Sequence, residues 1–361
     1  MRTISPDIPD ILAQYQAQIN KRLELFFEKK IAEASRISDH TREVVANAKE
    51  YTLRGGKRLR PIFCIYGYKC LRDNTNIEAV IEASISLELM QSYLLIHDDI
   101  MDEDELRRGK KTFHILCKDL CERHFGTTKS LKFGENIAIV AGDLLEVYGE
   151  EVLGKSPFES EYVKKAVVAY AEIVKNVGYG QILDITAERQ AAFSEDEILT
   201  IHKLKTASYT IEGPLHIGAL LAGANEADLQ VLSAYGIPLG LAFQIHDDIL
   251  GLFGSEEKTG KPVGSDVQEG KKTLLILHAL EKCTGEEREV ILNALGNEQV
   301  TMEEIDTVRA IVRRTGSLDY SKNLVADMTD KAVQAINASE FREEAKEFLF
   351  NIADFIGGRE Y

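Results

Sequence analysis

The chain has 361 residues, and its 44% hydrophobic and 28% charged fractions are those of a soluble globular protein rather than a disordered one. Its formal net charge of -16 argues against nucleic acid as the main partner, because phosphate backbones are held by an excess of Lys and Arg. Any anionic substrate must therefore be met by a local basic patch or by bound cations.

The cysteines and the N-terminus indicate the compartment. Cys117 and Cys121 form one close pair, but no second pair completes a zinc site, so reduced thiols are the simpler expectation. The first residues lack the basic-then-apolar shape of a signal peptide, and no apolar run approaches the ~18 residues of a membrane span. We expect a cytoplasmic protein with no membrane span.

Helical signals dominate the chain. Apolar residues recur at spacings of three and four in the segments 10–34, 76–101, 161–177, 196–222, 226–246 and 323–356. Alternating strand patterns bounded by Asn-Gly or Asp-Gly are missing. Loops are expected at 54–56, 103–112, 124–135 and 251–272, and none resembles an interdomain linker. The sequence predicts an all-α protein with a single domain over residues 1–361.

Several helix starts carry capping signals. Ser194, Thr284 and Thr301 each stand three residues before a Glu, which fits a capping box. Ser156, followed by proline, fits an N-cap with proline at the first helical position. We expect helices to begin at these four places.

An acidic motif ends the apolar segment 76–101. Asp98, Asp99 and Asp102 form a DDxxD pattern, in which positions 98 and 102 lie one helical turn apart on the same face. Crowded carboxylates repel one another unless a cation lies between them, and a few hard oxygen ligands suit Mg²⁺ that shares its shell with phosphates. A solvent-exposed acidic helix end would also explain an isolated motif.

The motif has a second copy. Ile-His-Asp-Asp-Ile occurs at 96–100 and again at 245–249, so that Gln244, Asp247 and Asp248 end another apolar helix. Identical polar endings on two buried helices suggest one shared site. A cluster of carboxylates facing basic residues is what a metal-bridged diphosphate needs. The basic residues that follow the first copy are Arg107, Arg108, Lys110 and Lys111.

Basic residues gather in two further places. Gly-Gly-Lys-Arg-Leu-Arg-Pro at 55–61 puts cations beside a glycine turn at a helix start, which suits a diphosphate, although the P-loop pattern is not matched. Lysines also crowd 258–273, after the second acidic motif, and Lys205 with Thr206 adds a cation and a hydroxyl. A solvated basic turn or loop is the alternative in each case.

Two histidines leave another class of enzyme open. His97 and His246 each precede an aspartate pair, and His-Asp is also the centre of helical metal-dependent phosphohydrolases. The other histidines show no paired metal-ligand spacing, so we expect both to be packed or to support the ligands of a metal.

As a set, the motifs resemble those of the trans-isoprenyl (polyprenyl) diphosphate synthases. The resemblance covers about residues 40–275, and the 251–273 loop looks like that of archaeal enzymes making geranylgeranyl or farnesyl diphosphate. It implies an all-α helical bundle around a deep central cavity, usually in a homodimer. The matching motifs, in the family's order, are Gly55-Gly56-Lys57-Arg58-Leu59-Arg60-Pro61, the first DDxxD with Arg107-Arg108-Gly109-Lys110, Ala141-Gly142-Asp143-Leu144-Leu145, Gly180-Gln181-x-x-Asp184, Lys205-Thr206 and Gln244-x-x-Asp247-Asp248.

The resemblance also implies substrates and residue roles. The enzyme would condense isopentenyl diphosphate with dimethylallyl, geranyl or farnesyl diphosphate, with three Mg²⁺ per site. Asp98, Asp102 and Asp247 would hold the metal, and Asp99, Arg107, Lys205 and Asp248 would complete the catalytic set. Arg107, Lys205, Thr206, Gln244, Lys261 and Lys271 would contact the allylic substrate. Gly56, Lys57, Arg60, Gln91 and Arg108 would hold isopentenyl diphosphate, with Gln91 at a position that is often His in the family.

One departure from the family pattern concerns the second motif. It ends in Gly251, where the family has a final carboxylate. Asp247 and Asp248 remain, and a metal that relies on water tolerates such a loss. Many relatives share this form, so activity is expected.

Side chains before Asp98 are expected to set the product length. Met90, Tyr93 and Leu94 lie within about two turns of it, and in the family bulk at the fourth and fifth positions upstream closes the chain tunnel. Tyr93 with the smaller Leu94 resembles archaeal makers of the twenty-carbon product, so geranylgeranyl diphosphate is expected and farnesyl diphosphate is the alternative. An ordinary core aromatic at Tyr93 is the simpler interpretation.

Two further interpretations remain open. One is a related class that uses the same aspartates, a terpene cyclase or a head-to-head condensing enzyme, and the Lys57 and Arg60 cradle for a second diphosphate argues against a cyclase. A non-catalytic regulatory partner should have lost an acidic motif, and this chain has not.

Overall fold

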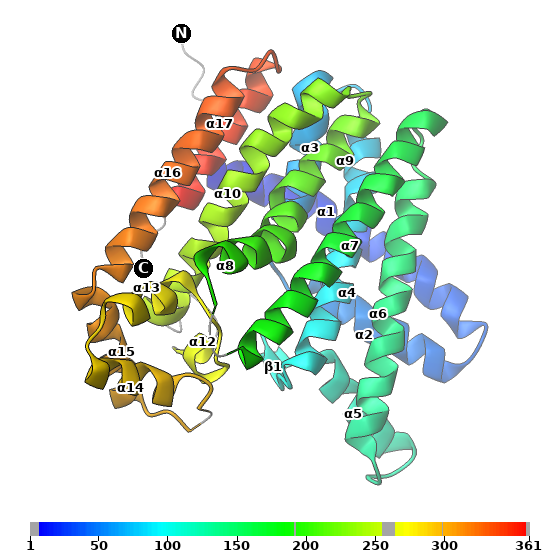
Figure 1. Cartoon of the computed structure of the whole chain (residues 1–361). Helices are drawn as coiled ribbons and strands as arrows, with labels where there is room; N and C mark the ends of the chain where they lie inside the picture. Colours follow the sequence, from blue (N-terminus) through cyan, green and yellow to red (C-terminus); the bar gives the residue numbers. More distant parts are fainter. Residues whose placement is uncertain (1–6, 191–192, 255–263, 298, 359–361) are drawn as a thin grey trace. The chain divides into compact units, whose positions relative to one another are not determined.

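The computed structural model describes residues 7–190, 193–254, 264–297 and 299–358. Within these ranges the chain is all-α apart from one short hairpin (Figure 1), which confirms the predicted fold class. Lys261, expected to contact the allylic substrate, lies outside the described residues.

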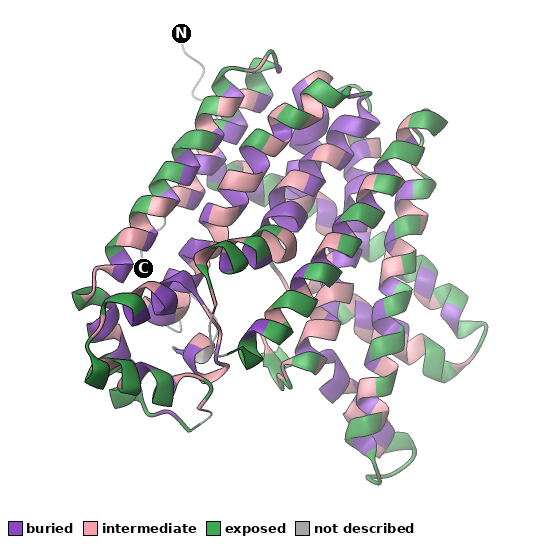
Figure 2. Cartoon of the chain, in the orientation of Figure 1, coloured by how far each residue is buried: buried purple, intermediate pink, exposed green. Residues whose placement is uncertain are grey.

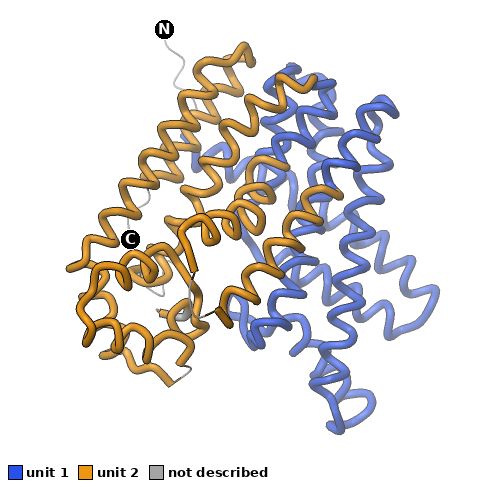
Figure 3. The backbone as a smooth tube through the Cα atoms, in the orientation of Figure 1, with its two compact units in different colours: residues 1–170, 214–224 blue, residues 171–213, 225–361 orange. Residues whose placement is uncertain are grey.

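The chain divides into two compact units, coloured separately in Figure 3. Unit 1 contains residues 1–170 and 214–224, and unit 2 contains residues 171–213 and 225–361. The divisions fall within or beside two helices, α7 (Ser160–Arg189) and α9 (Gly213–Leu221). A single domain over the whole chain stays a prediction.

Unit 1 is built around α4 (Ile77–Met101), which packs against α1, α3 and α6. Its residues are buried at every position from 83 to 90, which covers all faces of the helix, and Val80, Leu87 and Ile96 have no exposed surface. Buried residues of the chain are drawn in purple in Figure 2. A helix that is buried all round needs no polar stripe. The other helices of unit 1 are α1 (Ile8–Ser35), α2 (Asp39–Leu53), α3 (Leu59–Leu71), α5 (Phe113–His124) and α6 (Ser130–Gly154).

The apolar character of α4 corrects one expectation. This helix is long and apolar enough to cross a membrane, with a mean hydropathy of 1.3 over its most apolar window. However, 67% of that window is buried inside the protein, and a core helix passes the same test of length and composition. An apolar run of that length therefore exists, and packing within unit 1 accounts for it.

A short hairpin falls within the predicted loop 103–112. β1 (Leu106–Arg107) pairs antiparallel with β2 (Lys110–Lys111). Arg108 and Gly109 form the turn, with φ angles of 54° and 71°. Two-residue strands are too short to show an alternating pattern, so the sequence analysis missed them.

Unit 2 is built around α10 (Glu226–Phe253), which packs against α16 (Ser317–Asn337), α17 (Glu343–Gly357) and the π-helix η1 (Lys203–Glu212). π-helical turns are rare and frequently lie at functional sites. The other helices of unit 2 are α8 (Glu195–His202), α12 (Ser265–Gln268), α13 (Leu274–Lys282), α14 (Gly285–Ala294) and α15 (Met302–Arg314).

Three of the four predicted helix starts are confirmed. Ser194, Thr284 and Thr301 each accept a hydrogen bond from a first-turn backbone N–H and form capping boxes. The fourth is wrong, because α7 begins beyond it and the Ser156 hydroxyl donates to the Leu153 carbonyl oxygen at 2.7 Å.

Candidate active-site residues

The aspartates at the end of α4 face in two directions. Asp98 and Asp102 are half-buried and lie one turn apart, with Asp102 as the C-terminal cap of the helix. Asp99 is about 100° further round the helix and has no exposed surface. Asp98 and Asp102 are therefore placed to meet a cation, whereas Asp99 must be paired inside the protein.

Asp99 is paired with Tyr51 and Arg107. The Tyr51 hydroxyl donates to Asp99 Oδ2 at 2.6 Å, and Arg107 Nε donates to Asp99 Oδ1. Burial raises the pKa of Asp99, while Arg107 and Tyr51 oppose that shift. Arg107 also lies 3.4 Å from Asp104 and 3.9 Å from Asp98, both measured to its Nη2. Asp99 therefore holds the Arg107 guanidinium beside the outward-facing aspartates.

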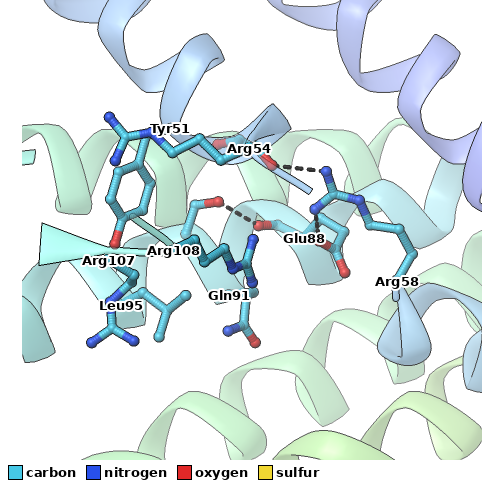
Figure 4. A pocket seen from close by; sticks show the side chains of 10 residues that line it. Tyr51, Arg54, Arg58, Glu88, Gln91, Leu95, Arg107 and Arg108 are labelled. Atoms are coloured by element: carbon cyan, nitrogen blue, oxygen red, sulfur yellow. Dashed lines mark hydrogen bonds and ion pairs between the residues drawn. The ribbon is translucent and has the colours of Figure 1, made fainter. Parts of the chain in front are cut away.

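A basic pocket lies next to this cluster in unit 1. Figure 4 shows Gln91, Arg107 and Arg108 together, with Arg58 and Glu88 forming an ion pair beside them. Gln91 and Arg108, both expected to hold isopentenyl diphosphate, line the pocket; Lys57 and Arg60 are not among its lining residues. The lining residues are Tyr51, Thr52, Arg54, Arg58, Glu88, Gln91, Ser92, Leu95, Arg107 and Arg108.

Arg58 is a structural residue of the pocket wall. Its backbone adopts a φ of 53° at the start of α3, and its side chain is buried. The guanidinium donates to Asn20 Oδ1 and to the Thr52 carbonyl oxygen, both at 2.9 Å, and pairs with Glu88. With these contacts made inside the protein, Arg58 shapes the pocket rather than serving as its free cation.

Three interactions fasten the hairpin to the end of α2. Arg108 Nη1 donates to the Gly55 carbonyl oxygen at 2.6 Å, and Lys110 Nζ lies 2.9 Å from Glu50 Oε1. Arg54 donates to the carbonyl oxygen of β2 residue Lys111. An added Cβ on Gly56 would lie 3.2 Å from the Arg108 guanidinium, so glycine there leaves room for this arginine. The Gly-Gly turn and the hairpin therefore form one assembly.

The residues expected to set product length differ in burial. Met90 has no exposed surface, whereas Tyr93 and Leu94 are half-buried. The Tyr93 ring meets the His97 ring edge-on, with centroids 4.9 Å apart. His97 Nε2 is 3.0 Å from the Ile139 carbonyl oxygen on α6. His97 is therefore packed against α6, as expected for a histidine that is not a metal ligand.

Glycine on α6 makes that packing possible. An added Cβ on Gly142 would come within 3.0 Å of His97 Nε2, closer than side chains tolerate. The Ala-Gly-Asp motif at 141–143 thus acquires a packing role in this chain.

In unit 2 the second acidic motif, like the first, has one half-buried and one buried aspartate. Asp247 is half-buried, and Asp248 is buried within the protein. Gln244 Nε2 donates to Asp248 Oδ1 at 2.8 Å, and the Thr206 hydroxyl donates to Gln244 Oε1 at 2.8 Å. His202 Nε2 lies 3.5 Å from Asp248 Oδ2. The structure therefore brings together three residues, Thr206, Gln244 and Asp248, that the sequence analysis places in one site.

Burial and charge act strongly on this cluster. Burial, with the charges of Asp266 and Asp247, raises the pKa of Asp248 well above its ordinary value, while the Gln244 hydrogen bond opposes the shift. Burial lowers the pKa of His202 to about 4, so this imidazole is neutral at neutral pH. A neutral histidine supplies no charge to balance the carboxylates.

Two lysines of unit 2 that are expected to contact the allylic substrate, Lys205 and Lys271, already have carboxylate partners. Lys205 Nζ lies 2.7 Å from Asp184 Oδ2, and Lys271 Nζ lies 2.5 Å from Glu269 Oε2 and 3.9 Å from Asp266 Oδ1. These carboxylates hold the two ammonium groups in position, and a bound diphosphate would replace the carboxylates as the partner of the ammonium groups.

The π-helix that carries Lys205 is packed closely between two helices. An added Cβ on Gly180 of α7 would lie 2.7 Å from the Lys205 backbone nitrogen. An added Cβ on Gly240 of α10 would come within 3.0 Å of the Ala207 Cα. These glycines let the backbone of η1 approach both helices and fix the position of Lys205.

The outward aspartates fit a hard divalent cation. Among the described residues, no three His, Cys, Asp or Glu side chains already converge in metal-ligand geometry. Mg²⁺ is usually held by one or two carboxylates, with waters and substrate phosphates completing its shell. Asp98 and Asp102 provide such a pair in unit 1, and Asp247 provides a further carboxylate in unit 2.

Comparison with known proteins identifies the family. The sequence model of the polyprenyl synthetases matches residues 42–312. This chain belongs to the polyprenyl synthetase family. A short chain isoprenyl diphosphate synthase of Methanothermobacter thermautotrophicus is 33% identical over 98% of this chain and 99% of its own. A geranylgeranyl diphosphate synthase of Sulfolobus acidocaldarius is 36% identical over 78% of this chain and 80% of its own.

Solved structures agree with this polyprenyl synthetase assignment. Geranylgeranyl pyrophosphate synthase from Corynebacterium glutamicum, complexed with isoprenyl diphosphate and magnesium, matches with a TM-score of 0.91 at 30% identity, covering 97% of this chain and 99% of its own. The His/Asp phosphohydrolase alternative is not supported by these matches.

Three residues of the chain were not given a role from the sequence. Tyr51 and Asp184 each bond a predicted site residue, Asp99 and Lys205 respectively. Asp266 lies beside the second acidic motif. Asp184 stood in a recognised motif, but the partners of Tyr51 and Asp266 are too distant in sequence for any periodic signal.

Proposed function

We propose that this chain is a divalent-cation-dependent short-chain trans-prenyltransferase. It would condense isopentenyl diphosphate with dimethylallyl, geranyl or farnesyl diphosphate, head to tail, to give mainly geranylgeranyl diphosphate. Membership of the polyprenyl synthetase family and the names of its relatives support this proposal. The observation that carries it is the Asp98 and Asp102 pair beside Arg107, which the buried Asp99 holds next to the basic pocket.

The proposed reaction assigns each group a task. Asp98, Asp102 and Asp247 would hold Mg²⁺, three ions per site, which supplies Lewis-acid stabilisation of the leaving diphosphate. Arg107, Lys205 and Lys271 would neutralise the same diphosphate while Thr206 and Gln244 orient it, and Lys261 would join them. Gln91 and Arg108, with Gly56, Lys57 and Arg60, would hold isopentenyl diphosphate. No side-chain nucleophile is needed, since the double bond of isopentenyl diphosphate attacks the allylic carbon and a proton is lost.

Product analysis tests the proposed activity. The purified protein is incubated with labelled isopentenyl diphosphate, farnesyl diphosphate and Mg²⁺. A discrete linear product is expected, and it should disappear with EDTA and with Asp98→Asn. Asp330→Asn, at an exposed position on α16, is the matched control and should elongate normally. Absence of elongation with every allylic starter would refute the proposal.

The product length has its own test. If the half-buried Leu94 borders the growing chain, Leu94→Phe should shift the main product made from dimethylallyl diphosphate from twenty towards fifteen carbons. Leu25→Phe, at an exposed position on α1, should leave the product unchanged. A fifteen-carbon product from the wild-type protein would make farnesyl diphosphate the correct alternative.

We also propose a cytoplasmic homodimer that uses an exposed apolar face of α6. Ile139, Val140, Leu144 and Val147 are 42%, 56%, 38% and 53% exposed, and the last three recur at helical spacing. Contiguous exposed apolar residues commonly mark interaction sites. Sedimentation should give the mass of a dimer, and Val140→Glu with Val147→Glu should give a folded monomer; an unchanged mass would exclude this face.

A further inference from the structure

Another carboxylate lies beside the position at which the second acidic motif lacks one. Position 251 is a glycine on α10, and an added Cβ there would come within 3.0 Å of Asp266 Oδ2. The Asp266 carboxylate thus occupies the volume into which a side chain at position 251 would extend. A side chain at 251 would therefore require the Asp266 carboxylate to move from its present place.

Backbone hydrogen bonds fix Asp266 beside α10. The Gly264 N–H donates to the Gly251 carbonyl oxygen at 3.1 Å, and the Val267 N–H donates to the Gly264 carbonyl oxygen at 3.0 Å. The Asp266 carbonyl oxygen accepts from the Lys271 N–H at 2.9 Å, and the Val267 side chain is buried. The start of α12 is therefore tied to the end of α10.

A second observation points to a bound cation. Asp248, on the same helix end, is 7% exposed, and its Oδ2 accepts no hydrogen bond from the described residues. His202 Nε2 lies 3.5 Å from this oxygen, and the Lys271 ammonium, 3.9 Å from Asp266 Oδ1, is shared with Glu269 at 2.5 Å. Asp247 stands one turn before position 251 on the same face of α10, so Asp247, Asp248 and the Asp266 carboxylate gather at one helix end. Such crowding is unfavourable unless a cation compensates it.

We propose that Asp266 replaces the absent final carboxylate of the second motif and joins Asp247 in holding the divalent cation at the end of α10. The inference rests on the proposed function, because that function supplies the cation. It explains why position 251 is glycine, since a carboxylate already fills the space from another element. The lysine-rich segment after α10 thereby contributes an acidic ligand as well as basic residues.

Cation binding itself can be measured without turnover. Mn²⁺ is titrated in the presence of inorganic diphosphate, and bound Mn²⁺ is followed by electron paramagnetic resonance. An Asp98→Asn, Asp102→Asn background removes the outward carboxylates of α4, so the remaining binding reports on α10. Adding Asp266→Asn, which keeps the shape and removes the charge, should weaken this binding about tenfold or more, the effect typical of residues supporting a metal site.

A carboxylate swap provides the decisive comparison. Asp266→Ala should lose binding as Asp266→Asn does, and Gly251→Asp with Asp266→Ala should recover it, because the aspartate now extends into the vacated space. Asp306→Asn, at an exposed position on α15, is the control that should change nothing. Thermal unfolding identifies any variant that fails to fold, in which case Asp266→Asn alone decides. Unchanged Mn²⁺ binding in folded Asp266→Asn, or a folded swap that recovers nothing, would overturn the inference.

The proposed function and the role of Asp266 are refuted by different results. Lack of elongation by the wild-type protein would refute the prenyltransferase proposal, whereas the Mn²⁺ titration would still report whether Asp266 binds the cation.

Discussion

Removing one oxygen atom tests whether Asp99 holds Arg107 as described. Tyr51→Phe deletes the hydroxyl that donates to Asp99 Oδ2 at 2.6 Å, with Tyr51 at 5% exposure and Asp99 at 0%. The ring keeps its edge-on contact with Phe113 and its position under Arg54, so little cavity is created. The effect should therefore come from the lost hydrogen bond alone.

The expected loss of stability follows from the charge of the acceptor. A hydrogen bond to a charged group contributes about 1.5–3 kcal/mol, and a buried acceptor left unsatisfied has no water to replace it. The free energy of unfolding should fall by that amount, which is about a 10- to 150-fold change in the equilibrium constant. Urea unfolding followed by circular dichroism measures it.

The pH dependence of this loss distinguishes the mechanism. Burial raises the pKa of Asp99, and the Tyr51 hydrogen bond opposes that shift by favouring the ionised form. Tyr51→Phe should therefore raise the pKa of Asp99 further. The difference in the free energy of unfolding between the wild-type protein and Tyr51→Phe should be largest while Asp99 is ionised. It should shrink as the pH falls through the pKa of Asp99, because a protonated carboxyl no longer needs the donor.

Activity should fall together with stability. In Tyr51→Phe the Asp99 carboxylate still bonds Arg107 but is no longer fixed by the Tyr51 hydroxyl. The Arg107 guanidinium is then held less firmly, so the Michaelis constant for the allylic diphosphate should rise. Tyr15→Phe is the matched control, since Tyr15 is a buried tyrosine of unit 1 whose ring packs against Tyr66 and Lys69. If both variants lose the same stability, or if Tyr51→Phe loses less than about 0.5 kcal/mol, the Asp99 hydrogen bond is not the cause.

Two further predictions concern thiols and helix packing. Burial raises the pKa of the Cys64 thiol to about 12, so the half-buried Cys283 should react first with a thiol reagent in the native protein, and all five cysteines only after unfolding. Fast reaction of several thiols in the native state would contradict the packing. Gly180→Ala should destabilise the protein by about 1–3 kcal/mol and weaken substrate binding, because the added methyl meets the Lys205 backbone at 2.7 Å. Gly178→Ala on the same helix faces open space and should be neutral or stabilising.

Patterns that act over one or two helical turns could be predicted from the sequence. The apolar spacing predicted the all-α class, and three capping boxes placed helix starts correctly because cap and partner are three residues apart. The contact between Gln244 and Asp248 is also of this short range, because a hydrogen bond joins two side chains that are four residues apart on one helix.

Contacts between distant segments could not be predicted in this way. Tyr51 reaches Asp99 across 48 residues, and nothing in a periodic pattern reports which turn a tyrosine will face. Asp99 itself was grouped with the catalytic aspartates, because sequence cannot tell which of two adjacent carboxylates faces inward. Asp266 is too far along the chain from Gly251 for any periodic signal, so its carboxylate could not be matched from the sequence to the position where the motif lacks one.

The hairpin has a consequence for how two substrates would influence each other. Arg107 reaches the buried Asp99 on one side, while its neighbour Arg108 reaches the Gly55 carbonyl oxygen beside the basic pocket. Because Arg107 and Arg108 are adjacent in the chain, a ligand that restricts the motion of one arginine also restricts the motion of the other. Because binding free energies are linked reciprocally, any factor by which the first diphosphate improves binding of the second must equal the factor in the opposite direction. Breaking the hairpin's attachment at Lys110 and Glu50 should therefore weaken synergy between the two substrates more than the affinity for either alone.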